Sequence, residues 1–134
     1  MPKSAEGVTY LDSSALVKLV VDEEESVALR KALAGAAART SSNIARVEMV
    51  RAVRGKGPEA VANARAILDG IELIQLDDEL LDLAGDLEGP LRSLDAIHLA
   101  AALELGEELE AVVTYDGQMA RAAETLGLRV VAPV

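Results

Sequence analysis

Two aspartates stand directly after short apolar runs in this sequence. Asp12 follows the run VTYL, and Asp116 follows the run AVVTY. Glu48 and Asp95 lie instead in helix-like segments and have apolar neighbours at helical spacing. A carboxylate directed toward an apolar surface is costly to bury unless a partner compensates its charge. These four acids are therefore the first candidates for chemistry.

Each acid also has a purely structural explanation. Asp12 and Asp116 each precede a predicted helix and could be N-terminal caps, a role in which aspartate is favoured. Asp95 lies in the first turn of a predicted helix, where a carboxylate interacts favourably with the helix dipole. Glu48 precedes Arg51 by three residues, so an exposed ion pair would explain it. Taken singly, every acid keeps both interpretations.

The four acids would form a metal site if the fold brought them together. Two carboxylates ~4 Å apart repel by up to ~4 kcal/mol at an effective dielectric of about 20, so a cluster needs protons or a cation. Ligation by oxygen alone favours Mg²⁺ or Mn²⁺ over zinc, which prefers histidine or cysteine. The residue types are thus compatible with a magnesium site, but they do not establish that the acids meet.

Other catalytic chemistries lack the residues they need. The sequence contains no cysteine, which excludes disulfides, thiolate catalysis and cysteine-ligated zinc. A histidine-based ribonuclease needs an acid and a base, and His98 is the only histidine. It follows Asp95 by three residues and so shares a helix face with it. We expect His98 to pack in the core or to support that acid rather than to catalyse.

Composition indicates a globular protein with an acidic surface. The chain of 134 residues fits one domain spanning 1–134, and 51% of the residues are hydrophobic. Residues 1–7 are expected to form a flexible tail. The net charge of −10 argues against non-specific nucleic-acid binding. The start MPKSAEG lacks the apolar core of a secretory signal, and no apolar run reaches the ~18–20 residues that span a bilayer, so we expect a cytoplasmic protein.

Apolar segments alternate with helical ones along the chain. Strands are expected at 8–11, 71–76, 111–115 and 129–134, whereas 38–42 is either extended or a loop. Helices are expected at 13–21, 22–34, 43–53, 59–68, 78–87, 93–105 and 117–126. The alternation predicts an α/β fold, a three-layer αβα sandwich with a mainly parallel sheet of four to five strands. Ligands of such sheets bind beyond the carboxyl ends of the strands, where Asp12 and Asp116 stand.

Four segments of the chain resemble the PIN-domain ribonucleases. They are YLDSSALVKL, TSSNIARVEMVRA, LRSLDAIHLAAAL and VVTYDGQMARAAETLGLRVVAP. The segments occur in the family's order and cover nearly the whole chain. Within the family, they look most like the VapC-type toxins of bacterial toxin–antitoxin pairs.

The resemblance implies a PIN-like fold with an acidic pocket. Asp12 and Asp95 would be the principal ligands of Mg²⁺, which Mn²⁺ could replace, and Glu48 and Asp116 would complete the pocket. Ser14 and Thr114 match small hydroxyl positions that line the pocket in relatives.

The implied activity is that of a Mg²⁺-dependent endoribonuclease toxin, a hydrolase of RNA phosphodiester bonds that leaves 5′-phosphate and 3′-hydroxyl ends. The implied partners are a small antitoxin protein and a second copy of the chain in a homodimer.

Contacts with RNA would require positive charge near the pocket. Several basic residues cluster around the helix that carries Glu48, although each one alone could be ordinary solvated charge. These RNA-contact candidates are Arg46, Arg51, Arg54 and Lys56. Lys18, Arg39 and Arg92 could add to the rim of the pocket.

Two other function classes compete with the nuclease. Aspartyl phosphotransfer of the dehalogenase type needs a second acid two residues after the first, and Ser14 stands there instead. A receiver domain needs a lysine that the segment VVTYDG does not offer. The main alternative is a non-catalytic RNA- or protein-binding module on a degenerate nuclease fold, although the intact set of acids argues against it.

Overall fold

Five parallel strands form the centre of the protein. The computed structural model describes residues 7–36 and 38–134. The strands β1 (Val8–Leu11), β2 (Ala38–Ser42), β3 (Glu72–Ile74), β4 (Leu109–Val113) and β5 (Val130–Val131) form one sheet in the order β3-β2-β1-β4-β5. The predicted α/β class with a mainly parallel sheet is therefore confirmed. The tail expected at residues 1–7 lies, apart from Gly7, outside the described residues.

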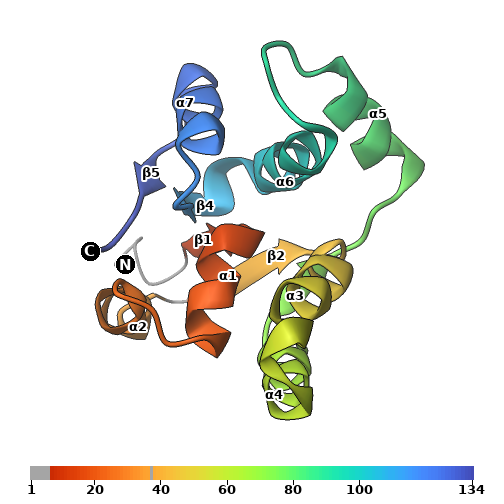
Figure 1. Cartoon of the computed structure of the whole chain (residues 1–134). Coiled ribbons are helices and arrows are strands. Elements are labelled where there is room, and N and C mark those ends of the chain that lie inside the picture. Colours follow the sequence, from red (N-terminus) through yellow and green to blue (C-terminus); the bar gives the residue numbers. More distant parts are fainter. Residues whose placement is uncertain (1–6, 37) are drawn as a thin grey trace.

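Helices cover both faces of the sheet (Figure 1). On one face lie α1 (Ser13–Val20), α2 (Ser26–Ala34), α3 (Ala45–Val53) and α4 (Pro58–Asp69), and on the other α5 (Asp78–Asp86), α6 (Ser93–Glu104) and α7 (Gly117–Thr125). Short 3₁₀ turns follow α3 at Arg54–Lys56 and α6 at Gly106–Glu108. None of the helices in the described part of the chain is long and apolar enough to cross a membrane.

Successive side chains of the central strands pack into two separate hydrophobic cores, one on each face of the sheet. Tyr10 and Val112 pack with buried residues of α5, α6 and α7. Their neighbours Leu11 and Val113 pack with buried residues of α1 to α4. This alternation follows from the pleat of a β-strand, and the register pairs Tyr10 with Val112 and Leu11 with Val113.

The main differences from the sequence-based expectations concern β2, the start of α2 and the length of β5. Residues 38–42 form an inner strand, β2, which pairs with β1 and β3. The polar sequence ARTSS did not indicate an inner strand, although its last three residues are buried. The helix expected from Asp22 begins at Ser26, whose hydroxyl accepts from the Glu23 amide and donates to the Lys18 carbonyl. The last strand contracts from 129–134 to Val130–Val131.

The strand order places a crevice beside the end of β1. From β1 the chain builds β2 and β3 on one side, and it later adds β4 and β5 on the other side. Ligands of parallel sheets bind at such a reversal, outside the carboxyl ends of the strands. Asp12 follows β1 directly, and Asp116 lies three residues beyond the end of β4. The fold thus brings these two acids to the same edge of the sheet.

Candidate active site

The four candidate acids line one hollow at the carboxyl edge of the sheet. Its volume is about 340 Å³, and its other lining residues are Ser13, Ser14, Arg92, Ser93 and Leu94. Asp12 comes from the end of β1, Glu48 from α3, Asp95 from the first turn of α6, and Asp116 from the residue that caps α7. Segments that are distant in sequence therefore converge on a single acidic pocket.

Asp12 is both a helix cap and the most buried member of the pocket. Its side chain is only 3% exposed. One carboxylate oxygen accepts from the Ala15 amide at 3.0 Å and from the Ser14 hydroxyl at 2.6 Å, and the other accepts from the Thr114 hydroxyl at 2.5 Å. Burial raises the pKa of Asp12, although the hydrogen bonds from Ser14 and Thr114 oppose this effect. The capping interpretation and the site interpretation are thus compatible.

Asp116 and Asp95 are joined by an arginine. The Oδ1 atom of Asp116 accepts from the Met119 amide at 2.9 Å and so caps α7. Its Oδ2 atom lies 2.8 Å from Nη2 of Arg92, and Nε of the same guanidinium lies 3.2 Å from Oδ2 of Asp95. The Arg92 side chain is 68% exposed, so it can swing away without losing packing. The sequence pointed to Arg92 only as a rim residue and did not reveal this bridge.

Glu48 has a different partner from the one that its sequence position indicates. Its Oε1 atom lies 2.7 Å from Nε2 of His98, and its Oε2 atom accepts from the Ser13 hydroxyl at 3.4 Å. Within the described ranges no ion pair joins Glu48 to Arg51. His98 was expected beside Asp95, but its polar contacts are with Glu48 and Tyr10. The helical spacing correctly placed His98 on the same helix as Asp95, but it could not show which neighbouring helix the imidazole faces.

Two hydroxyl groups connect the ends of β1 and β4. Ser14 lines the hollow, donates to Asp12 and accepts from the Tyr115 amide at 2.9 Å. Thr114 is buried behind Asp12, and its hydroxyl accepts from the Asp116 amide at 3.1 Å. These bonds fix the positions of both aspartates relative to each other.

The donor set of the pocket suits a hard cation. Carboxylate and hydroxyl oxygens are the ligands that Mg²⁺ and Mn²⁺ prefer. Across residues 7–36 and 38–134, however, no three acidic or histidine side chains are spaced to hold a metal ion together. The Arg92 guanidinium pairs with both Asp95 and Asp116 in this arrangement and offsets one of their two negative charges. Shared coordination of a cation by these acids requires Arg92 to move away from them.

The expected RNA-contact residues lie outside the hollow. Arg46 pairs with Asp69 at 3.1 Å. Arg51 is exposed on α3, and Arg54 and Lys56 are exposed on the turn that follows it. The cation that does line the hollow is Arg92.

The other two rim candidates make contacts elsewhere. Lys18 pairs with Glu23 at 3.1 Å and Glu25 at 2.9 Å, and its ammonium lies 4.8 Å from the centre of the Tyr115 ring. Arg39 stands near the amino end of β2, at the opposite edge of the sheet from the acids. Neither residue lines the acidic pocket.

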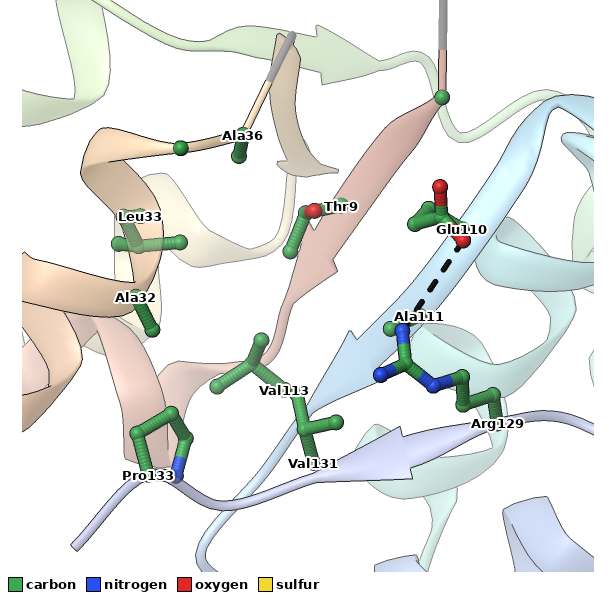
Figure 2. Close-up of a pocket in the computed structure, with 12 residues that line it drawn as sticks. Thr9, Ala32, Leu33, Ala36, Glu110, Ala111, Val113, Arg129, Val131 and Pro133 are labelled. Carbon is green, nitrogen blue, oxygen red and sulfur yellow. Dashed lines mark ion pairs between the residues drawn. The ribbon is translucent and has the colours of Figure 1, made fainter. Parts of the chain in front are cut away.

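A second hollow, of about 480 Å³, lies between α2 and the strands β1, β4 and β5 (Figure 2). Apolar side chains such as Leu33, Val113 and Val131 line much of it. Its charged groups are Glu110 and Arg129, which approach each other to 4.0 Å. None of the four acids borders it, so its lining offers no comparable set of cation ligands. The smaller acidic pocket is the better candidate for chemistry.

Comparison with known proteins identifies the family of the chain. The PIN domain family model matches residues 9–125. Ribonuclease VapC46 of Mycobacterium tuberculosis is 50% identical over 125 residues, which cover 92% of this chain and 96% of that protein. Ribonuclease VapC47 of the same species is 39% identical over 131 residues, with the same coverage.

Solved structures show the same fold at low sequence identity. The M. tuberculosis toxin VapC20, described as cleaving the sarcin–ricin loop, superposes with a TM-score of 0.76 at 18% identity and covers 93% of this chain and 99% of its own. A toxin–antitoxin complex from Klebsiella pneumoniae gives a TM-score of 0.70 at 20% identity, with 94% of this chain and 98% of its own covered. The chain thus belongs to the PIN-domain family and, within it, to the VapC ribonucleases.

Proposed function

We propose that this chain is a Mg²⁺-dependent endoribonuclease that acts as the toxin of a toxin–antitoxin pair. The observation that carries the proposal is the gathering of four acids in one hollow at the reversal point of the strand order. Relatives with up to 50% identity are named ribonucleases. The whole chain would act as one domain, because its five strands join a single sheet.

In this proposal, the four acids bind the cation, and the cation displaces Arg92 from Asp95 and Asp116. Asp12 and Asp95 are the principal ligands, Glu48 and Asp116 complete the pocket, and Mn²⁺ can replace Mg²⁺. The bound ion would polarise a phosphoryl oxygen and lower the pKa of a coordinated water. Three hydrogen bonds keep Asp12 in one orientation, so its position is fixed before any ligand arrives.

The protein's own groups then direct the attack on RNA. Glu48 or Asp116 orients the attacking water and accepts its proton, and hydrolysis leaves 5′-phosphate and 3′-hydroxyl ends. Glu48 suits this role because His98 and Ser13 hold its two oxygens. Once displaced from Asp95 and Asp116, the Arg92 guanidinium can bind a phosphate at the mouth of the pocket.

Positive charge beside the pocket would bind the RNA backbone. The candidates lie on α3, which carries Glu48, and on the turn that follows it: Arg46, Arg51, Arg54 and Lys56. The chain as a whole carries a net charge of −10, so this local patch must act against the overall field. Binding should therefore weaken steeply with added salt.

The proposed partners are a small antitoxin and a second copy of the chain. An arginine of the antitoxin could bridge the acids, since Arg92 already shows that a guanidinium fits between Asp95 and Asp116. Expression without the antitoxin should slow growth, and co-expression should restore it. Light scattering of the purified chain measures whether it is a dimer.

RNA cleavage with a metal control tests the central activity. The purified chain is incubated with a structured RNA in Mg²⁺, and a parallel reaction contains EDTA. Asp95→Asn keeps the shape of a ligand and removes its charge, whereas Asp77→Asn changes an exposed helix cap outside the pocket. We expect cleavage by the wild type and by Asp77→Asn, but not by Asp95→Asn. Cleavage that persists in EDTA, or in Asp95→Asn at the wild-type rate, would contradict the proposal.

The same experiment separates the nuclease from a non-catalytic binding module. A binding module would retain RNA in a gel-shift assay without cleaving it. It would also show no thermal stabilisation by Mg²⁺ or Mn²⁺, because Asp95 and Asp116 would stay paired with Arg92. That combination of results would favour the alternative.

A further inference from the structure

A buried hydrogen-bonded chain connects the sheet to Glu48. The Tyr10 hydroxyl lies 2.7 Å from Nδ1 of His98, and Nε2 of the same ring lies 2.7 Å from Oε1 of Glu48. Tyr10 is fully buried and His98 is 1% exposed, whereas the Glu48 side chain is 14% exposed and borders the acidic hollow. The chain of contacts thus runs from the core to the pocket.

The three residues come from different layers of the fold. Tyr10 belongs to β1, two residues before Asp12, and His98 belongs to α6. Glu48 belongs to α3, which packs on the opposite face of the sheet from α6 (Figure 1). His98 therefore links the two helical layers at the carboxyl edge of the sheet. Both ring nitrogens of this buried histidine are satisfied, one by a residue of β1 and the other by a residue of α3.

The chemistry of the partners sets the direction of the hydrogen bonds. An ionised carboxylate only accepts, so the ring must present Nε2–H to Glu48. In neutral imidazole the other nitrogen is then an acceptor, and a hydroxyl facing it must donate. Burial raises the pKa of Tyr10, so its hydroxyl keeps the proton that it donates. The Tyr10 and His98 rings also meet edge to face, with centroids 5.7 Å apart and planes at 73°, which limits rotation of the imidazole.

We propose that Tyr10 and His98 are positioning residues that fix the Glu48 carboxylate through a Tyr10 O–H···Nδ1, Nε2–H···Oε1 relay. This inference rests on the proposed function in one respect: Glu48 must belong to the cation site. Partners behind a metal ligand orient it before the ion arrives, and their loss commonly weakens metal binding ~10–100-fold. His98 accordingly acts through Glu48 and does not itself touch the RNA or the metal.

The single histidine makes the first test direct. A chain without a polyhistidine tag has one imidazole, so both imidazole ¹⁵N resonances belong to His98, and their couplings to the protons on the ring carbons distinguish Nδ1 from Nε2. At neutral pH and without metal, the relay predicts a proton on Nε2 and none on Nδ1. In Tyr10→Phe the loss of the donor should shift the Nδ1 resonance. A proton found on Nδ1, or on both nitrogens, would overturn the relay.

The second test measures Mn²⁺ affinity by the electron paramagnetic resonance signal of the free ion. His98→Leu replaces the imidazole by an apolar side chain of similar size and so removes the donor, whereas His98→Gln places an amide N–H near the former Nε2. We expect the Mn²⁺ dissociation constant to rise ~10-fold or more in His98→Leu and less in Tyr10→Phe. It should stay within ~3-fold of wild type in His98→Gln, the conservative replacement.

Tyr115→Phe is the matched control for Tyr10→Phe. It deletes the hydroxyl of the other tyrosine, which donates to the Pro133 carbonyl at 2.7 Å. This control should bind Mn²⁺ like the wild type. Thermal unfolding of all variants identifies any that have lost the fold, and Tyr10→Phe, which keeps the buried ring, decides the question if His98→Leu fails to fold.

The outcomes separate the relay from the proposed function. If the wild type binds Mn²⁺ and cleaves RNA while Tyr10→Phe and His98→Leu bind it equally well, the positioning role is wrong and the nuclease proposal stands. If the wild type binds no Mn²⁺, the proposed function fails. The spectrum then tests only the hydrogen bonds that hold Glu48: a proton on Nε2 and a shifted Nδ1 resonance in Tyr10→Phe would support them, and any other result would overturn them.

Discussion

Replacing Asp12 by asparagine should stabilise the metal-free protein. The carboxylate is 3% exposed, and burial raises its pKa. Asparagine has the same shape, and its oxygen can still accept from the Ala15 amide and the Ser14 hydroxyl. Its amide can donate to Thr114, whose hydroxyl can turn toward Ser14, 3.4 Å away. The variant thus removes a buried charge without leaving a polar group unpaired.

The size and pH dependence of this effect follow from the environment of Asp12. Burying a charge costs several kcal/mol, and the three hydrogen bonds return most of it, so we expect a net gain of ~1–2 kcal/mol. For a chain of this length, that gain corresponds to a rise of ~4–8 °C in the unfolding temperature. Because folding raises this pKa, the buried charge destabilises the fold above the folded-state pKa. The gain should therefore be largest near neutral pH and shrink as the pH falls and Asp12 takes up a proton.

Thermal unfolding in EDTA at several pH values measures this prediction. Asp77→Asn is the matched control, because Asp77 also caps a helix, by accepting from the Leu80 amide, but is exposed. That variant should change the unfolding temperature little at any pH. An Asp12→Asn protein that is less stable than the wild type at neutral pH would refute the claim that the buried Asp12 charge destabilises the folded protein.

Three further changes probe the same site. Thr114→Val keeps the side-chain shape but leaves Asp12 without one donor and the Asp116 amide without its acceptor. Denaturant unfolding should therefore show a free energy of unfolding that is lower by ~1–3 kcal/mol, a change opposite in sign to that of Asp12→Asn. Arg92→Gln removes the guanidinium that pairs with Asp95 and Asp116, so Mn²⁺ titrated without RNA should bind more tightly than to the wild type, and unchanged or weaker binding would contradict the bridge. Replacing Arg54 and Lys56 by alanine should weaken RNA binding. The slope of the logarithm of the binding constant against the logarithm of the salt concentration should fall by about one unit for each phosphate contact that is lost. An unchanged slope would show that the two residues do not contact the RNA.

The sequence predicted the helices, apart from the start of α2, and the position of the acids at the edge of the sheet. Asp12 follows β1 directly and Asp116 lies three residues after β4, so the geometry of a parallel sheet predicts that the two acids lie close together. Glu48 and Asp95 were singled out because a charge among apolar neighbours needs a partner. The β2 strand was ambiguous because its buried residues are threonine and serine, whose polarity conceals a strand that neighbouring strands enclose.

The partners within the site could not be predicted in the same way. His98 shares a helix face with Asp95, yet it contacts Glu48, because contacts across two helical layers depend on how those layers pack. Arg92 was expected only at the rim of the pocket, and neither its ion pair with Asp95 nor the one with Asp116 was predicted. Helical spacing determines neighbours along one element, whereas a site assembled from several elements requires the tertiary fold.

A crystal structure of the wild type with Mn²⁺ tests the central claim most directly, because anomalous scattering locates the ion without assumptions about activity. We predict an anomalous peak within ligand distance of Asp12 and Asp95, with the Arg92 guanidinium displaced from Asp95 and Asp116. A fully occupied peak elsewhere on the protein, or an acidic pocket that stays bridged by Arg92 at saturating Mn²⁺, would contradict the proposed cation site.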